Sequence, residues 1–287
     1  MRPPTPQGYP GGLVALNPAL PVVLLPDVHA RYEMLNRLLN HNFGGLSLQE
    51  GLEQGQIQLV ALGDYPHAEH RAKVRWAHAL QEFQAGYASH EAMDQEMAEA
   101  QATWAKLMQL KWEYPQGVHL LKGNHENICN EAQGANRSFA KFAWEGEMTF
   151  AWATRFWGVE VVAALAQWEH SLPLVALGDR FVASHARPAE AYDSARLIHP
   201  SDEVVFGLTW TRPGSAQPGA ALQTMKALWG HSAGIWFCGH NPVERGCQWD
   251  KQEAIVQFHD PNQEQAILLL PDTSFDPVRD LIPLGQV

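Results

Sequence analysis

Five apolar runs in this 287-residue chain each end in a short segment whose side chains could bind a metal ion. These side chains are Asp27 and His29, Asp64, Asn124 and His125, His185, and His240. One such residue after a strand would be read as a turn or helix-capping residue, but the repetition along one chain favours a shared role. Carboxylate, amide and imidazole ligands together suit manganese, iron or zinc, and not a thiolate-bound structural zinc.

The second of these segments, GDYPHAEH (63–70), is especially rich in ionisable side chains. It could form a metal site, a general acid–base site, or only a solvated turn before the next helix. The letters VALGD that lead into it, at 60–64, occur again at 175–179. There Asp179 precedes a further apolar run to His185, which indicates a hairpin turn. The dipeptide Gly-Asp alone is therefore a poor guide to the site.

Strands must bring these segments together. Amphipathic patterns predict helices at 32–39, from about 71 to 113, and over the Trp-rich stretch 135–170, while 172–188 reads as a β-hairpin. The last fifty residues alternate short strands with Pro and Asn turns. Strand–loop–helix units followed by hairpin strands predict a mixed α/β architecture. In such sheets, functional groups gather beyond the carboxyl ends of the strands.

Composition narrows the class of protein. With 46% hydrophobic and 18% charged residues, the chain has the balance of a soluble globular protein. Its formal net charge of -11 opposes nucleic acids and anionic membranes, so neither is expected as a partner. Three cysteines without a CxxC pair favour a reducing compartment. No run approaches the roughly 18 apolar residues of a membrane span, and the N-terminus lacks a signal-type apolar region, so we expect a cytoplasmic protein.

The ordered set of motifs resembles the calcineurin-like metallophosphoesterases, and within them the phosphoprotein phosphatase branch, in a bacterial form. That branch carries GDxHG, GDxxDRG, GNHE, a later His and a final GH. The corresponding segments here are PDVHA (26–30), GDYPHAE (63–69), GNHE (123–126), SHARP (184–188) and GHNP (239–242). The resemblance spans roughly residues 22 to 270, and the insertion between the second and third motifs is longer than usual.

The resemblance implies a fold and a domain plan. The expected fold is a sandwich of two mixed β-sheets flanked by helices, with a helical insertion at about 71–113. One metallophosphoesterase domain would cover 21–287, preceded by an N-terminal tail or edge segment at 1–20.

The resemblance also implies a binuclear metal centre, with manganese as the first choice and iron or zinc as alternatives. One ion would be held by Asp27, His29 and Asp64. The second would be held by Asp64, as a bridging ligand, together with Asn124, His185 and His240. A metal-bridging hydroxide would then attack the phosphorus atom of a phosphate ester directly. His125 would act as the general acid that protonates the leaving alkoxide.

The sequence indicates the residues that bind the substrate phosphate less clearly than it indicates the metal ligands. Arg212, in LTWTRPG (208–214), lies where the resembled family has a phosphate-binding Arg, and Asn124 and Arg187 are further candidates. The Asp-Arg-Gly of GDxxDRG is replaced here by 67–69, His-Ala-Glu. In the family this Asp supports the acid histidine and this Arg binds phosphate. Glu69 could orient His125 instead, and His67 or Arg71 could face the phosphate.

Glycines of the first motif are also replaced, by Pro26 and Ala30, so we expect its loop to take a different path.

The predicted activity is that of a Ser/Thr protein phosphatase-like phosphomonoesterase. Hydrolysis of nucleotides such as dinucleoside polyphosphates is the alternative substrate class. A catalytically silent phosphatase-fold binding protein is the alternative of another kind, supported only by the missing Asp-Arg pair. A DNA-processing nuclease is disfavoured because the chain is acidic and has no basic stripe.

Overall fold

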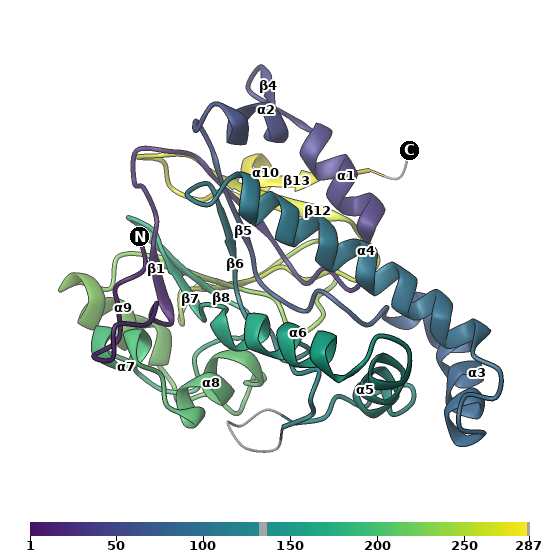
Figure 1. Ribbon diagram of the computed structural model, residues 1–287. Helices are drawn as coiled ribbons and strands as arrows, with labels where there is room; N and C mark the ends of the chain where they lie inside the picture. Colours follow the sequence, from purple (N-terminus) through teal and green to yellow (C-terminus); the bar gives the residue numbers. More distant parts are fainter. Residues whose placement is uncertain (132–136, 286–287) are drawn as a thin grey trace.

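Two mixed β-sheets lie face to face at the centre of the molecule, and helices cover their outer faces (Figure 1). The computed structural model describes residues 1–131 and 137–285. Within these residues, the larger sheet has the spatial order β1 (Leu13–Ala15), β7 (Val175–Leu177), β8 (Phe181–Ser184), β9 (Ile235–Cys238), β11 (Ile255–Gln257) and β10 (Gln248–Asp250). The smaller sheet has the order β13 (Leu281–Pro283), β12 (Gln265–Leu269), β2 (Val22–Leu25), β5 (Gln58–Ala61) and β6 (Val118–Leu120).

Helices belong to three groups along the chain. The first group, with the small hairpin β3 (Asn42–Phe43) and β4 (Leu46–Ser47), comprises α1 (Tyr32–Asn40) and α2 (Leu48–Glu53). The central group comprises the 3₁₀ turn η1 (His70–Ala72), α3 (Lys73–Gln84), α4 (Glu91–Glu113), α5 (Glu145–Phe156) and α6 (Val159–Ser171). The last group comprises α7 (Ser194–Ile198), α8 (Asp202–Thr209), α9 (Ala220–Trp229) and α10 (Pro277–Asp280).

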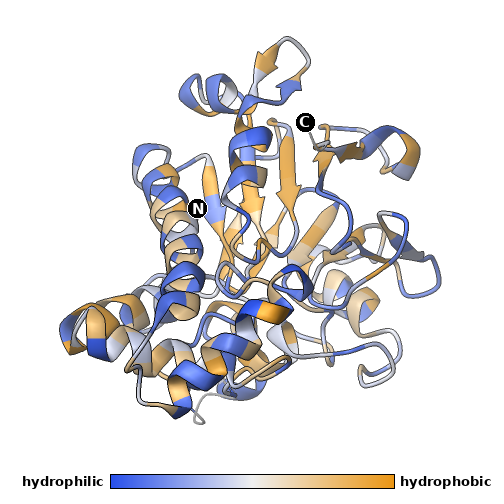
Figure 2. Ribbon diagram, turned by 90° about the vertical axis from the view of Figure 1, so that its right-hand side faces the viewer, coloured by the Kyte–Doolittle hydropathy of each residue, from blue (hydrophilic) through white to orange (hydrophobic). Residues whose placement is uncertain are grey.

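Strand β2 shows why the sandwich forms. All four of its residues are apolar and buried. Side chains alternate across a strand, so Val23 and Leu25 pack under the helices while Val22 and Leu24 pack between the two sheets. A strand covered on both faces is expected to be apolar throughout, and Figure 2 shows the central strands in hydrophobic colours.

Strand directions place the chain's loops at one edge of the sandwich. Strands β2, β5 and β6 run parallel to one another in the smaller sheet. In the larger sheet, β8, β9 and β11 also run parallel to one another. Each set therefore delivers its following loops at a common carboxyl end, where open α/β sheets carry their functional groups.

The predicted mixed α/β fold with two mixed sheets is confirmed. The predicted hairpin is confirmed as well, since β7 and β8 pair antiparallel across Gly178 and Asp179. The predicted N-terminal tail or edge segment contains β1, and residues 13–15 form an edge strand of the larger sheet beside β7.

The range predicted as one helical insertion, 71–113, contains two helices, α3 and α4. The chain turns between them at Gly86, whose φ of 66° lies in the left-handed region that favours glycine. The range 135–170 is helical only from Glu145 onward in its described part, because 137–144 form a loop before α5. Residues 132–136 lie outside the described residues.

The insertion is fastened to the loop that follows β5. Trp76 of α3 is fully buried, and its indole Nε1 donates a hydrogen bond to the Ala68 carbonyl at 2.8 Å. The Ala68 amide donates to the buried carboxylate of Glu96 in α4 at 2.7 Å. Glu96 also pairs with Arg75 of α3. Both backbone polar groups of Ala68 are thus held by the insertion.

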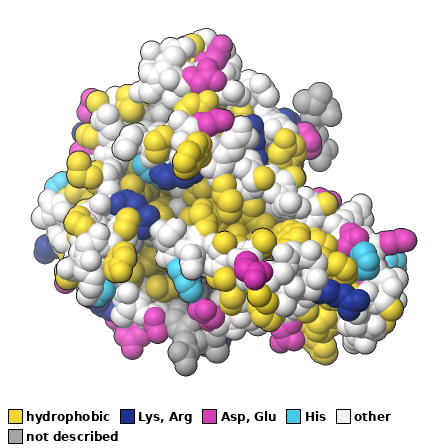
Figure 3. All heavy atoms as spheres, in the orientation of Figure 1, with side chains coloured by type: hydrophobic (Ala, Val, Ile, Leu, Met, Phe, Trp, Pro, Cys, Tyr) yellow, Lys and Arg dark blue, Asp and Glu magenta, His cyan; other side chains and the backbone are white. Residues whose placement is uncertain are grey.

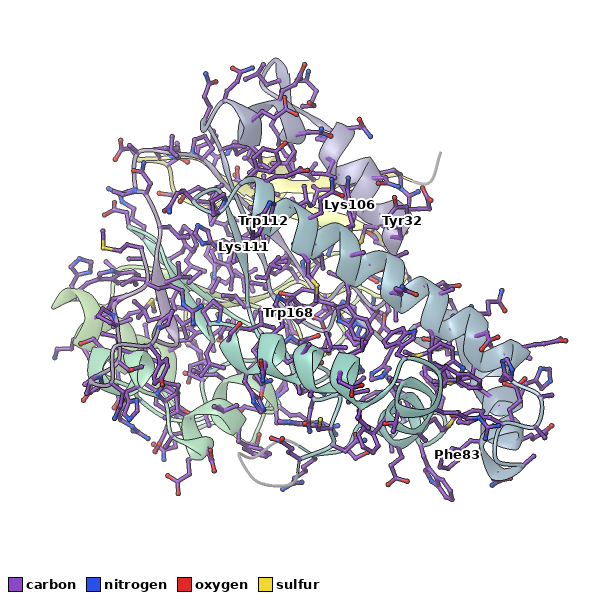
Figure 4. The ribbon with its side chains drawn as sticks, in the orientation of Figure 1. Tyr32, Phe83, Lys106, Lys111, Trp112 and Trp168 are labelled. Atoms are coloured by element: carbon purple, nitrogen blue, oxygen red, sulfur yellow. The ribbon has the colours of Figure 1, made fainter. Side chains whose placement is uncertain are left out.

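Helix α4 spans much of the face seen in Figure 1. Its Lys111 donates from Nζ to the carbonyls of Pro115 and Val118, both at 2.8 Å, and so ties the end of the helix to β6. Hydrophobic side chains gather between α4 and α6 on this face (Figure 3). Trp112 is 86% exposed. Figure 4 shows it on α4, with Trp168 of α6 below it. Within residues 1–131 and 137–285, no helix is long and apolar enough to cross a membrane.

We expect Trp76→Ala to lower the free energy of unfolding by about 3–5 kcal/mol, because it removes a fully buried ring and its hydrogen bond. Trp76→Phe keeps most of the packing and should cost much less. Trp112→Ala is the matched control at an exposed site and should change stability by about 0.5 kcal/mol or less. Urea unfolding followed by tryptophan fluorescence and circular dichroism measures all three. Equal losses in Trp76→Ala and Trp112→Ala would contradict the assignment of Trp76 to the core.

Candidate metal centre

The loops that follow six strands of the two sheets meet in one buried cluster. Those after β2, β5 and β6 of the smaller sheet carry Asp27 and His29, Asp64, and Asn124 with His125. Those after β8, β9 and β11 of the larger sheet carry His185, His240 and His259. All of these side chains are buried except that of His240, which is half-buried. The predicted strand-end residues are therefore brought together, and His259 joins them.

One group of possible ligand atoms surrounds His29. Its Nε2 lies 3.9 Å from Asp27 Oδ2 and 3.9 Å from Asp64 Oδ2. His259 Nε2 lies 3.9 Å from the same Asp27 oxygen. Asp27, His29 and His259 each offer an atom within one metal-sized cluster. Sequence reasoning did not single out His259, although FHDP (258–261) repeats the pattern of a strand followed by a His.

A second group lies on the other side of Asp64. Asn124 Oδ1 is 2.9 Å from His185 Nε2 and 2.8 Å from His240 Nδ1. The two histidine nitrogens are 3.2 Å apart. Asp64 Oδ1 lies 3.4 Å from His185 Nε2. One amide oxygen, two imidazole nitrogens and one carboxylate oxygen thus converge on a common point.

Asp64 contributes one oxygen to each group, because its Oδ2 faces His29 and its Oδ1 faces His185. The side chain is almost inaccessible, and burial, together with the charges of Asp27 and Glu126, raises its pKa well above the ordinary value. Burial likewise raises the pKa of Asp27. Two buried carboxylates that destabilise each other's charge are well suited to a cation between them.

The imidazole rings are oriented to present a free nitrogen. His29 Nδ1 lies 3.0 Å from the His67 carbonyl, and His185 Nδ1 lies 3.1 Å from the Leu62 carbonyl. An Nδ1–H donated to a carbonyl leaves the Nε2 lone pair for a metal, an arrangement typical of ligand histidines. Burial lowers the pKa of His29 to about 3 and that of His185 well below its ordinary value, which keeps both rings neutral. The donor set therefore fits divalent metal ions.

Several residues in these loops have strained backbone conformations. His29 (φ 47°), Asp64 (φ 50°) and His240 (φ 62°) all lie in the left-handed region that non-glycine residues rarely adopt. Ala30, where the resembled family has glycine, lies there too at φ 56°. Such strain persists only where surrounding contacts over-determine the backbone, and it clusters at functional sites. Gly239 is required for a different reason, since a Cβ there would overlap the Asp27 carboxylate.

A buried carboxylate outside both ligand groups joins two of the loops. Glu126 accepts hydrogen bonds from the backbone amides of Gly123 at 2.6 Å, Tyr65 at 2.8 Å and Asp64 at 2.9 Å. The loop after β6 is thereby fixed against the loop after β5.

His125, the expected general acid, pairs with a second histidine. Its Nδ1 lies 3.0 Å from Nδ1 of His67, and its Nε2 lies 3.5 Å from Asp64 Oδ2. His67 Nε2 in turn lies 3.0 Å from the Thr149 hydroxyl of α5. His67 therefore occupies the supporting place that the sequence suggested for Glu69. Glu69 instead contacts His259 at 3.1 Å and Arg31 at 2.9 Å.

An aromatic side chain covers this histidine pair. The ring of Phe139, from the loop before α5, lies 3.6 Å from the ring of His125 between centroids and stacks on His67 at 5.9 Å. Neither Phe139 nor Thr149 carried a sequence signal, because Phe139 comes from the loop before α5 and Thr149 from α5 itself, and neither belongs to a motif.

The positively charged candidates differ in their surroundings. Arg71 is engaged by Glu99 at 2.7 Å and by the His29 and Ala30 carbonyls. Arg187 is half-buried and donates to Gln257 at 3.2 Å. Arg212 is exposed beside the second group, where burial first and then the Arg212 charge lower the pKa of His240 to about 4.

Asp179, in the second Gly-Asp sequence of the chain, is exposed whereas Asp64 is buried. Its side chain is 64% exposed at the β7–β8 turn, as expected for a hairpin residue.

Comparisons with known proteins give the family and the fold of the chain. Residues 20–269 match the family model of the calcineurin-like phosphoesterases. A search of curated proteins found no match. Among solved structures, a protein serine/threonine phosphatase from Saccharomyces cerevisiae with similarity to human phosphatase PP5 is 14% identical, with a TM-score of 0.59 over 95% of this chain and 82% of that one. A putative diadenosine tetraphosphatase is 15% identical, with a TM-score of 0.48 over 95% and 98% of the two chains.

At 14% identity, the likeness to the Saccharomyces cerevisiae phosphatase shows the fold alone, while the family match covers most of the chain. The chain therefore belongs to the calcineurin-like phosphoesterase family, and it is a metal-dependent phosphoesterase.

Proposed function

We propose that the chain is a binuclear metal-dependent phosphomonoesterase. The observation that carries this proposal is the position of Asp64, whose Oδ2 lies 3.9 Å from His29 Nε2 and whose Oδ1 lies 3.4 Å from His185 Nε2. A carboxylate that offers one oxygen to each of two ligand groups is suited to bridge two ions.

In this proposal Asp27, His29 and Asp64 hold the first ion, and Asp64, Asn124, His185 and His240 hold the second. Oxygen and imidazole ligands favour manganese, with iron or zinc as alternatives. When bound, such a metal pair supplies activation of water and neutralises charge on the phosphate. The chain has no need of a covalent phosphoenzyme for this chemistry.

His125 is the proposed general acid, and it would release its Nε2 proton to the oxygen of the leaving alcohol. His67 would position it, because the contact between the two Nδ1 atoms at 3.0 Å fixes the plane of the His125 ring. As a general acid, His125 would be an imidazolium with a proton on each ring nitrogen. Its Nδ1–H would donate to His67 Nδ1, and its Nε2–H would be the proton released to the leaving group. A neutral His67 would then donate from Nε2 to the Thr149 hydroxyl, 3.0 Å away.

Arg212 is the proposed ligand of the substrate phosphate, since its exposed side chain lies beside His240, the half-buried member of the metal ligands. Arg187 is a second candidate. For Arg71 and His67 the contacts already made leave less freedom, because Arg71 binds Glu99 and both ring nitrogens of His67 face partners.

The substrate we favour is a phosphate monoester on a protein Ser or Thr, with nucleotides such as dinucleoside polyphosphates as the competing class. The exposed Arg212 at the more accessible side of the site suits a substrate that extends beyond the phosphate. We place the protein in the cytoplasm, on its acidic charge and on the cysteine pattern.

We expect Asp64→Asn to bind fewer ions and to lose at least about 100-fold in kcat on an aryl phosphate with Mn²⁺, because a neutral amide bridges two cations poorly. Asp179→Asn is the matched control, since it alters the same VALGD sequence at an exposed turn, and it should keep wild-type turnover. Metal analysis of the purified protein and initial rates measure both. A wild-type chain that binds fewer than two ions and hydrolyses no phosphate ester would refute the proposal.

For His67→Ala we expect kcat to fall by about 100-fold with little change in KM, because the general acid loses its orientation. The loss should be greater for an alkyl phosphate than for an aryl phosphate, since an alkoxide leaving group depends more on protonation. His67→Asp should recover part of the activity, because a carboxylate can also accept a hydrogen bond from His125 Nδ1. His78→Ala, at an exposed position of α3, is the control. The same loss on both substrates would exclude a role for His67 in positioning the acid.

Turnover on a phosphopeptide panel and on a nucleotide panel distinguishes the two substrate classes, and we expect the phosphopeptides to be preferred. We expect Arg212→Gln to raise KM about tenfold, as for loss of one charged hydrogen bond to phosphate. Arg180→Gln, at the β7–β8 turn, should leave KM unchanged. Preference for nucleotides would assign the enzyme to the competing class.

A further inference from the structure

Glu69 lies at the edge of the first ligand group. The resembled family has glycine at this position, and the metal-sized group of Asp27, His29 and His259 does not include Glu69. Its Oε1 is 3.1 Å from His259 Nε2 and 3.5 Å from His29 Nε2. The residue is 6% exposed. A buried carboxylate oxygen thus faces the two imidazole nitrogens that are directed at the first site.

These distances fit two atoms that share an ion, and the shorter one is also that of a hydrogen bond. Two ligand atoms, each about 2.1 Å from one ion, lie about 3 to 3.5 Å apart at the angles of octahedral or tetrahedral coordination. Both contacts of Glu69 Oε1 fall in that range. The distances from His29 Nε2 to Asp27 Oδ2 and Asp64 Oδ2, at 3.9 Å, are somewhat longer. Glu69 Oε1 therefore lies nearer to His29 Nε2 than the oxygens of Asp27 and Asp64 do.

The other oxygen of Glu69 is held in place. Oε2 accepts a hydrogen bond from Arg31 Nη2 at 2.9 Å, and the same nitrogen donates to the Pro261 carbonyl at 3.1 Å. A carboxylate with one oxygen fixed by an outer partner and the other presented inward is the usual arrangement of a metal-ligating carboxylate.

The charges of the cluster point in the same direction. Asp27, Asp64 and Glu69 are three buried carboxylates around the imidazoles of His29 and His259, and Arg31 is the cationic side chain that pairs with Glu69. A cation among these groups would offset charge that one guanidinium cannot.

We infer that Glu69, through Oε1, and His259, through Nε2, complete the ligand set of the first ion. This inference rests on the proposed binuclear function. The first site would then have five protein ligands, Asp27, His29, Asp64, Glu69 and His259, three of them carboxylates. The second site would keep four. A set of five or six ligands rich in oxygen favours a manganese or iron ion over a tetrahedral zinc.

The inference also gives the two sites different tasks. A first site with five protein ligands has at most one further position in an octahedral ion, so the more open second site, beside Arg212, has more room for a phosphate oxygen. The departure from the family pattern at 67–69 would thus serve the metal centre as well as the acid histidine.

The test uses the full chain stripped of metal and titrated with Mn²⁺ by calorimetry, and then with Co²⁺, whose visible absorption depends on the number and kind of its ligands. In Glu69→Gln we expect one site to keep wild-type affinity and the other to bind roughly 100-fold more weakly, with a changed cobalt spectrum. Glu69→Asp, which withdraws the carboxylate by one methylene, should show the same change in milder form and serves if Glu69→Gln does not fold.

Glu96→Gln is the matched control. Glu96 is also a buried carboxylate paired with an Arg, and it binds the Ala68 amide directly beside Glu69, but it contacts none of the ligand residues by a hydrogen bond or ion pair in the described chain. It should bind two ions with wild-type affinity and an unchanged cobalt spectrum.

Three results would overturn the inference: Glu69→Gln with wild-type affinity at both sites, weaker binding with an unchanged cobalt spectrum, which would place Glu69 outside the ligand shell, or equal effects in Glu96→Gln. A wild-type chain that binds fewer than two ions would instead refute the proposed function, so the two failures are distinguishable.

Discussion

The arrangement of the site depends on the hydrogen bonds that the Glu126 carboxylate accepts, although Glu126 lies outside both ligand groups. It accepts three backbone hydrogen bonds, from Gly123, Asp64 and Tyr65, and so joins the loop after β6 to the loop after β5. Burial raises its pKa, and the backbone donors oppose that effect. Asp64 needs such support, because its backbone is held in the left-handed region and its two oxygens must face opposite ligand groups.

Several parts of the structure could be predicted from sequence because they follow from local rules. A short apolar run must be covered on both faces, so β2 was recognisable as a central strand. Parallel strands deliver their loops at one edge, so Asp27, Asp64 and Asn124 could be expected together even though up to 97 positions separate them. The hairpin around Asp179 followed from its Gly-Asp turn. These features depend on periodicity and turn chemistry, which a single sequence contains.

The corner formed by His67, Glu69 and His259 could not be predicted in the same way. Glu69 and His259 are 190 positions apart, and their contact depends on how β11 lies beside β9. The pairing of His67 with His125 requires a φ of 60° at His67, a conformation that sequence patterns do not indicate for a histidine. The sequence marked His67 and Glu69 as ionisable side chains of one loop, but it did not indicate their partners and did not single out His259. Direction of a side chain in a strained loop is set by tertiary contacts and not by local propensity.

The two hydrogen bonds that the insertion makes to Ala68 have a mechanical consequence. Trp76 of α3 binds the carbonyl of that residue and Glu96 of α4 binds its amide. The next residue along the chain is Glu69, and the preceding one is His67. Local opening of α3 and α4 would therefore release residues 67–69 together. We expect the insertion and the loop after β5 to open as one cooperative unit in native-state fluctuations. A change in the sequence or length of α3 and α4, even at a distance from the cluster, would be transmitted to the loop after β5 as a change in its rigidity.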